Sequence, residues 1–195
     1  MNARGDYAFR RAFLLASLAL ACIFVPAFQR TAFAQTATSP IPLPSPFTPV
    51  VDYAGVIDPK PGKGSRRFTV NLKQRADIEF SVVTVDTTGG RDIFEYSLDV
   101  YRGWEIGTKT NDGFLLLAAI KDRKYYTQVG YHLEGDLNDG VVGEIQRQYL
   151  VPQFKKGNYS KGLEDTVKAY VATLAQKRGF TIEGSTRATP IASLR

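Results

Sequence analysis

The 195-residue sequence contains one cysteine, one histidine, one tryptophan and one methionine. The cysteine, Cys22, lies inside an N-terminal apolar run of the kind that is removed during export, so we expect a processed chain without any cysteine. A chain without cysteine has no disulfides, no thiolate metal ligands and no cysteine nucleophile. The single histidine, His132, also leaves no second histidine for a two-metal hydrolase.

Complete motifs of common hydrolases are missing as well. The sequence has no Gly-x-Ser-x-Gly elbow and no phosphate-binding glycine loop of the GxxxxGK type. Residues 85–88 (VDTT) follow a strand-like segment, as the nucleophile of an aspartyl phosphatase does, but no second aspartate stands two residues after Asp86. The residues therefore assign no enzyme class, and whether the chain is an enzyme stays open.

Composition and charge indicate one soluble globular domain. Hydrophobic residues make up 44% of the chain and charged residues 23%, which excludes both a disordered chain and a polytopic membrane protein. Loss of residues 1–34, with four arginines and one aspartate, lowers the formal net charge from +6 to +3. No cluster of lysine or arginine remains, so we expect no nucleic-acid partner.

Residues 1–34 have the pattern of a signal peptide. Three arginines precede the apolar run Ala12–Val25, and Ala32-Phe33-Ala34 supplies small residues for cleavage before Gln35. We therefore expect an exported protein, periplasmic or extracellular. The alternative is an uncleaved segment that anchors the domain to the membrane, although the run is shorter than a spanning helix needs and ends at Pro26.

The rest of the chain divides into a proline-rich linker at 35–49, expected to be an extended tether, a domain at 50–179 and a polar tail at 180–195. Within the domain, hydrophobic periodicity predicts strands at 79–85 and 114–120, a hairpin strand at 124–129, and helices at 68–76, 91–104, 139–149 and 161–177. We expect the third helix to stop before Pro152, and the fourth to be capped by Ser160 and ended by Gly179. Alternating strands and helices indicate an α/β fold.

Several short blocks follow one another over roughly residues 50–178: VDYAGVI at 51–57, FSVVTV at 80–85, GWEIG at 103–107, NDGFLLL at 111–117, VGYHLEGDLND at 129–139, PQF at 152–154 and GNYSKGL at 157–163. These blocks, in this order, resemble the TPM domain family. The resemblance implies a single-domain α/β/α sandwich with a mixed sheet, in proteins that are mostly exported or attached to membranes. A thylakoid-lumen branch of the family is linked to photosystem II repair and acid phosphatase activity, and some members bind calcium.

The chain departs from that family pattern in two places. It lacks the C-terminal membrane helix and glycine-rich tail of many bacterial members, and His132 stands where glycine is usual in the Gly-Tyr-Gly-Leu-Glu motif.

Acidic residues in glycine-rich loops are the only constellation with a chemical interpretation. If the fold brings these loops together, their carboxylates offer the hard oxygens that Ca²⁺ or Mg²⁺ prefers. The predicted metal ligands are Asp52, Asp112, Glu134, Asp136 and Asp139.

Each acidic residue also has a local explanation. Asp139 or Asn138 can cap the following helix, Asp112 can stabilise a turn before Gly113, and Asp52 can accept bonds from nearby backbone amides. Trp104, at the end of a predicted helix, is best explained as a core residue.

A carboxylate cluster without a nucleophile favours a binding or accessory module of the cell envelope, with a divalent cation and a protein partner. The alternative, which rests on the family resemblance, is a metal-assisted acid phosphatase.

Overall fold

The structure, a computed structural model, describes residues 38–59, 64–109 and 112–181. The predicted signal peptide at 1–34, Asn111 and residues 182–195 of the predicted tail lie outside these ranges. Within them, no helix has both the length and the apolar character needed to cross a membrane.

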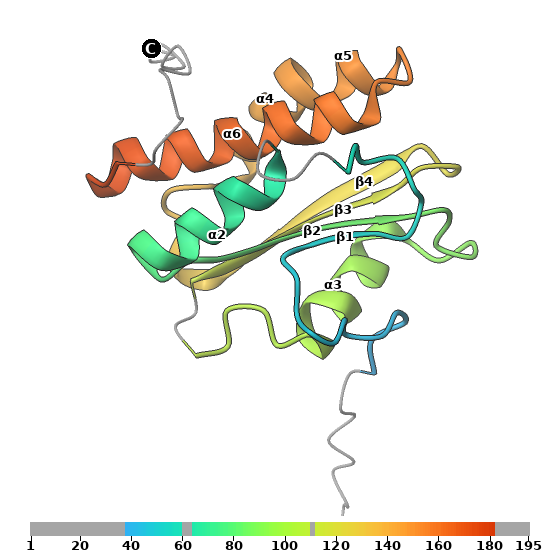
Figure 1. Ribbon diagram of the computed structural model, residues 1–195, viewed down its shortest axis with the longest axis horizontal. Coiled ribbons are helices and arrows are strands. Elements are labelled where there is room, and N and C mark those ends of the chain that lie inside the picture. Colours follow the sequence, from blue (N-terminus) through green and yellow to red (C-terminus); the bar gives the residue numbers. More distant parts are fainter. Residues whose placement is uncertain (1–37, 60–63, 110–111, 182–195) are drawn as a thin grey trace, which may run out of the picture. The chain divides into compact units, whose positions relative to one another are not determined.

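A four-stranded mixed sheet forms the centre of the domain, in the order β1-β2-β3-β4 (Figure 1). The strands are β1 (Val50–Asp52), β2 (Glu79–Val85), β3 (Gly113–Ala119) and β4 (Lys124–Val129). The first three strands are parallel, with Val51 opposite Val83 and Val83 opposite Leu117. β4 runs antiparallel to β3, with Leu116 opposite Thr127, as the predicted hairpin requires.

Helices cover both faces of this sheet (Figure 1). One face carries α2 (Ser65–Ala76), α4 (Asp139–Ile145), α5 (Val151–Phe154) and α6 (Tyr159–Arg178), and the other carries α3 (Ile93–Gly103). Side chains alternate along β3, so Phe114 and Leu116 join the core cluster under α2 and α6, while Leu115 and Leu117 join the cluster under α3. The predicted α/β/α sandwich with a mixed sheet is confirmed.

The third predicted helix continues past Pro152, which corrects the expected stop. Residues Gln146–Leu150 form a π-helical turn, η2, and α5 follows directly with Pro152 in its first turn. Pro152 stands directly after this π-helical turn, in which the Val151 amide bonds to the Gln146 carbonyl, so the change in hydrogen-bond spacing falls where the proline has no N–H to donate.

The two ends of α6 differ in how well the sequence predicted them. Gly179 ends α6 in the left-handed conformation, with φ 73°, as predicted. Ser160 does not cap α6, because its hydroxyl accepts a hydrogen bond from the Asp58 amide at 3.0 Å instead.

Residues 38–49, which belong to the stretch expected to be an extended tether, contact the domain. Ile41 packs in the cluster under α3, and its carbonyl accepts a hydrogen bond from Trp104 Nε1 at 3.2 Å. A Cβ on Gly103 would lie 2.6 Å from Ser39 Cβ, so glycine permits this close approach. Trp104 is only 5% exposed, which confirms it as a core residue.

Candidate functional site

Two of the predicted metal ligands, Asp112 and Asp136, meet at one end of the sheet, with the guanidinium of Arg178 between them. Arg178 Nη1 donates to Asp112 Oδ1 at 3.0 Å and its Nε donates to Asp136 Oδ2 at 2.6 Å. Its Nη2 donates to the His132 carbonyl at 2.7 Å. A cation of the chain itself therefore bridges the two carboxylates and ties the loop after β4 to the end of α6.

Asp52 lies at the opposite end of the parallel strands, because it ends β1 whereas Asp112 precedes β3. Its carboxylate accepts hydrogen bonds from the amides of Val56 at 3.1 Å and Ile57 at 2.8 Å, and from the Thr84 hydroxyl. The local explanation, bonding to nearby amides, applies to this residue.

The remaining predicted ligands, Glu134 and Asp139, are exposed. Asn138 caps α4 by accepting a hydrogen bond from the Val141 amide at 3.1 Å, and Asp139 occupies the first helical turn, where the helix dipole favours it. Within residues 38–59, 64–109 and 112–181, no three His, Cys, Asp or Glu side chains are grouped as a metal site requires.

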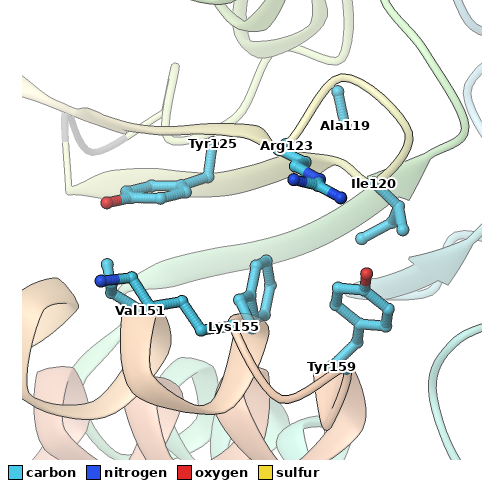
Figure 2. Close-up of a pocket in the computed structure, with 9 residues that line it drawn as sticks. Ala119, Ile120, Arg123, Tyr125, Val151, Lys155 and Tyr159 are labelled. Carbon is cyan, nitrogen blue, oxygen red and sulfur yellow. The ribbon is translucent and has the colours of Figure 1, made fainter.

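A pocket of ≈ 470 Å³ opens at the other end of the sheet, where β2 and β3 finish. The β3–β4 hairpin lies on one side of it, and α5 with the start of α6 on the other, so that Arg123 and Tyr125 face Val151, Lys155 and Tyr159 (Figure 2). We call it the hairpin pocket, and it is lined by Ala119, Ile120, Arg123, Tyr125, Val151, Phe154, Lys155, Gly157 and Tyr159.

The hairpin pocket has positive charge without a compensating carboxylate. Among its lining residues in the described part of the chain, Arg123 and Lys155 are charged and none is acidic. Arg123 has φ 55°, a left-handed conformation that costs a non-glycine residue roughly 1–2 kcal/mol. A left-handed residue at the end of a short hairpin loop is common, so this conformation belongs to the β3–β4 turn.

Three aromatic rings in the hairpin pocket form an edge-to-face row. The ring centroids of Tyr125 and Phe154 are 6.4 Å apart at 84°, and those of Phe154 and Tyr159 are 5.1 Å apart at 80°. No Ser, Thr, Cys, His, Asp or Glu lines the pocket within the described ranges, so the potential nucleophiles in its lining are Lys155 and the two tyrosines, with no histidine or carboxylate beside them in that lining to act as a base.

Comparison with known proteins identifies the family. A search of curated proteins found no match, but the family model described as the TPM domain matches residues 50–173. The chain belongs to the TPM domain family.

Solved structures with a similar fold include two bacterial domains. The first is the N-terminal domain of a protein from P. gingivalis, 29% identical, with a TM-score of 0.62, covering 67% of this chain and 84% of that one. The second, the N-terminal domain of a protein from Corynebacterium glutamicum, is 12% identical with a TM-score of 0.52, over 73% of this chain and 84% of that one, and supports the fold alone.

In this TPM domain, the glycines of the GWEIG and NDGF blocks hold loops together. A Cβ on Gly107, which has φ 71°, would lie 2.5 Å from the Gly113 amide nitrogen. The Gly107 amide donates to Glu79 Oε2 at 2.7 Å, and Lys73 Nζ lies 3.0 Å from Glu79 Oε1. Burial acts to raise the pKa of Glu79, but these two contacts outweigh it and lower the pKa.

The aspartate that anchors the VDTT segment of this TPM domain lies in the β3–β4 hairpin. Asp122 Oδ2 accepts hydrogen bonds from the Thr88 amide at 2.7 Å and the Thr88 hydroxyl at 3.1 Å, and Asp122 Oδ1 accepts one from the Thr87 hydroxyl at 2.8 Å. These hydrogen bonds, of which the one from the Thr88 amide has the largest effect, lower the pKa of Asp122.

The sequence analysis did not predict the hairpin pocket, although ligands in α/β folds commonly bind beyond the carboxyl ends of parallel strands.

Proposed function

We propose that this TPM domain is a binding module that acts outside the cytoplasm and holds an anionic ligand in the hairpin pocket. The observation that supports the ligand's charge is that Arg123 and Lys155 both line a pocket whose described lining has no carboxylate. The signal-peptide pattern of residues 1–34 supports the location.

An anion in the hairpin pocket gains charge-assisted hydrogen bonds that water alone does not match. Arginine offers a planar fork of donors and lysine a compact ammonium, and a hydrogen bond to a charged group contributes about 1.5–3 kcal/mol. The described lining has no His, Asp or Glu that could act as a base on Lys155 or the tyrosines, which favours binding over covalent catalysis.

Titration calorimetry of the purified protein with inorganic pyrophosphate tests this function. We expect binding by the parent protein, and a dissociation constant raised roughly tenfold in Arg123→Gln and in Lys155→Gln, since about 1.4 kcal/mol corresponds to tenfold. Lys156→Gln is the matched control, because Lys156 is an exposed neighbour outside the pocket lining. No binding by the parent protein, or equal weakening in all three variants, would refute an anion site here.

The divalent cation remains a prediction from the acidic residues. Calcium or magnesium bound by Asp112 and Asp136 has to displace the Arg178 guanidinium that bonds both carboxylates. A melting temperature that rises with Ca²⁺ in the parent protein supports the cation, and an unchanged melting temperature counts against it.

Acid phosphatase activity and a protein partner in the envelope also remain predictions. A phosphatase that depends on the acidic loops loses turnover of a general phosphomonoester in Asp112→Ala and Asp139→Ala. Turnover that is absent, or unaffected by both substitutions and by metal, argues against metal-assisted hydrolysis there.

A further inference from the structure

The hairpin pocket has more room than an inorganic anion needs. Its volume of ≈ 470 Å³ falls within the range of roughly 300–1,000 Å³ that is typical of small-molecule sites. At about 30 Å³ for each water molecule, this volume corresponds to roughly 15 waters. A ligand that fills the pocket therefore has a body in addition to its charged group.

The wall of the pocket favours a planar body. Tyr125, Phe154 and Tyr159 all line it, and their edge-to-face order leaves ring faces and edges as contact surfaces. Aromatic pairs in such arrangements contribute about 0.5–1.5 kcal/mol beyond the burial of area, an interaction that a saturated body lacks.

The position of the Phe154 ring depends on a glycine in the first turns of α6. A Cβ on Gly162 would lie 3.0 Å from Phe154 Cδ1 and 3.2 Å from Phe154 Cε1. Glycine inside a helix destabilises it by roughly 0.5–1 kcal/mol relative to alanine. At this site the glycine leaves space for the ring that lines the pocket.

A membrane surface fits the pocket poorly as the source of the ligand. Among the described residues, six large hydrophobic side chains are exposed, and none of them lines the hairpin pocket. An apolar rim able to insert into lipid is therefore missing around this mouth, in the part of the chain that the structure describes.

We propose, building on the anion-binding function above, that the ligand is a small molecule that joins a planar ring to an anionic group. The anionic group lies against Arg123, and the ring lies against Phe154 between the two tyrosines. The cationic lining sets the sign of the ligand's charge, and the row of rings selects the planar body.

Calorimetry with three phosphate monoesters tests this selectivity: methyl, cyclohexyl and phenyl phosphate. We expect phenyl phosphate to bind about tenfold more tightly than methyl phosphate, which corresponds to about 1.4 kcal/mol. Cyclohexyl phosphate has a similar size without a planar ring, so its affinity should fall between the two.

Phe154→Leu and Tyr159→Leu each remove one ring while keeping an apolar side chain, and circular dichroism checks that each variant folds. We expect both to reduce the preference for phenyl over methyl phosphate, and to leave the affinity for methyl phosphate within about twofold. Lys156→Gln should keep the tenfold preference.

The outcomes separate the two proposals. Equal affinity for phenyl and methyl phosphate, both weakened by Arg123→Gln, overturns the planar ring and leaves the anion-binding function standing. Equal affinity for cyclohexyl and phenyl phosphate also overturns the planar ring. Failure of all three esters to bind overturns the planar ring, and failure of pyrophosphate to bind as well overturns both.

Discussion

Replacement of Arg178 is the most informative perturbation at the acidic end of the sheet. Its guanidinium bonds Asp112, Asp136 and the His132 carbonyl, and thereby connects three segments: the residue before β3, the loop after β4 and the end of α6. We predict that Arg178→Ala destabilises the domain and leaves two carboxylates without this shared partner.

The expected loss of stability in Arg178→Ala follows from how exposed the three charged side chains are. The Arg178 side chain is 29% exposed, and those of Asp112 and Asp136 are 21% and 22% exposed, so the pairs lie between surface and interior. Exposed ion pairs contribute about 0–1 kcal/mol, and hydrogen bonds to charged groups about 1.5–3 kcal/mol. For three bonds of intermediate exposure, we expect a loss of about 2–3 kcal/mol in the free energy of unfolding.

Urea denaturation measures this loss, with thermal melting as a second readout. At roughly 2–4 °C for each kcal/mol, the melting temperature should fall by roughly 5–10 °C. Arg178→Lys should lose about half as much, because an ammonium keeps the charge but lacks the planar fork that bonds both carboxylates at once.

Lys161→Ala is the matched control for Arg178→Ala. It removes an i,i+4 pair with Asp165 on the same helix, where the lysine side chain is 61% exposed, and should lose less than about 0.5 kcal/mol. Equal losses in the two variants would refute the structural role of the Arg178 contacts.

Three further substitutions test individual contacts. Asp122→Asn should make the free energy of unfolding, measured in urea, less dependent on pH in the acid range. Hydrogen bonding, first of all from the Thr88 amide, lowers the pKa of Asp122 from its ordinary value of 3.8. The stabilisation by the ionised Asp122 is therefore present above that value and is lost as the pH falls below it. A parent protein and a variant with parallel pH curves would contradict this. Arg123→Gly should relieve a left-handed conformation and raise stability by about 0.5–1 kcal/mol, while it weakens pyrophosphate binding roughly tenfold, as Arg123→Gln does. A destabilised variant would argue against the strain. Gly107→Ala should lower the free energy of unfolding by about 3 kcal/mol or more, against about 1 kcal/mol for the control Gly90→Ala. Both glycines have positive φ, but only Gly107 has backbone atoms within 4 Å of an added Cβ. Similar losses in the two variants would show that close packing at Gly107 is unimportant.

Local patterns predicted the strands and helices well because burial follows them closely. The run from Phe114 to Ala119 is at most 1% exposed, as a central strand covered on both faces must be. Pro152 and Ser160 were misjudged because the outcome depends on a π-helical turn and on the distant Asp58 amide. Residues 38–49 looked like a tether because their contacts, such as Ile41 with Trp104, are far apart in sequence.

The candidate site was harder to predict from the sequence than the helices and strands, because its position depends on the topology of the sheet. Asp52 and Asp112 both border strands, but one ends its strand and the other precedes a parallel strand, which places them at opposite ends of the sheet. Arg178 gave no sequence indication that it would contact both Asp112 and Asp136.

The hairpin pocket joins two stretches that carry no motif together. Arg123 comes from a turn and Lys155 from the end of a short helix, and only the packing of α5 and α6 over the hairpin makes them neighbours of one cavity. Periodicity reports which face a residue occupies, and it does not report which loops share an end of the sheet.

Binding of an anion in the hairpin pocket is tested most directly by mapping amide chemical shifts of the ¹⁵N-labelled protein during titration with phenyl phosphate. We predict saturable shifts concentrated at residues 119–125 and 151–159, with little change around Arg178 at the other end of the sheet. Shifts that fail to saturate, or that cluster around Asp112 and Asp136 instead, would contradict an anion site between the β3–β4 hairpin and α5.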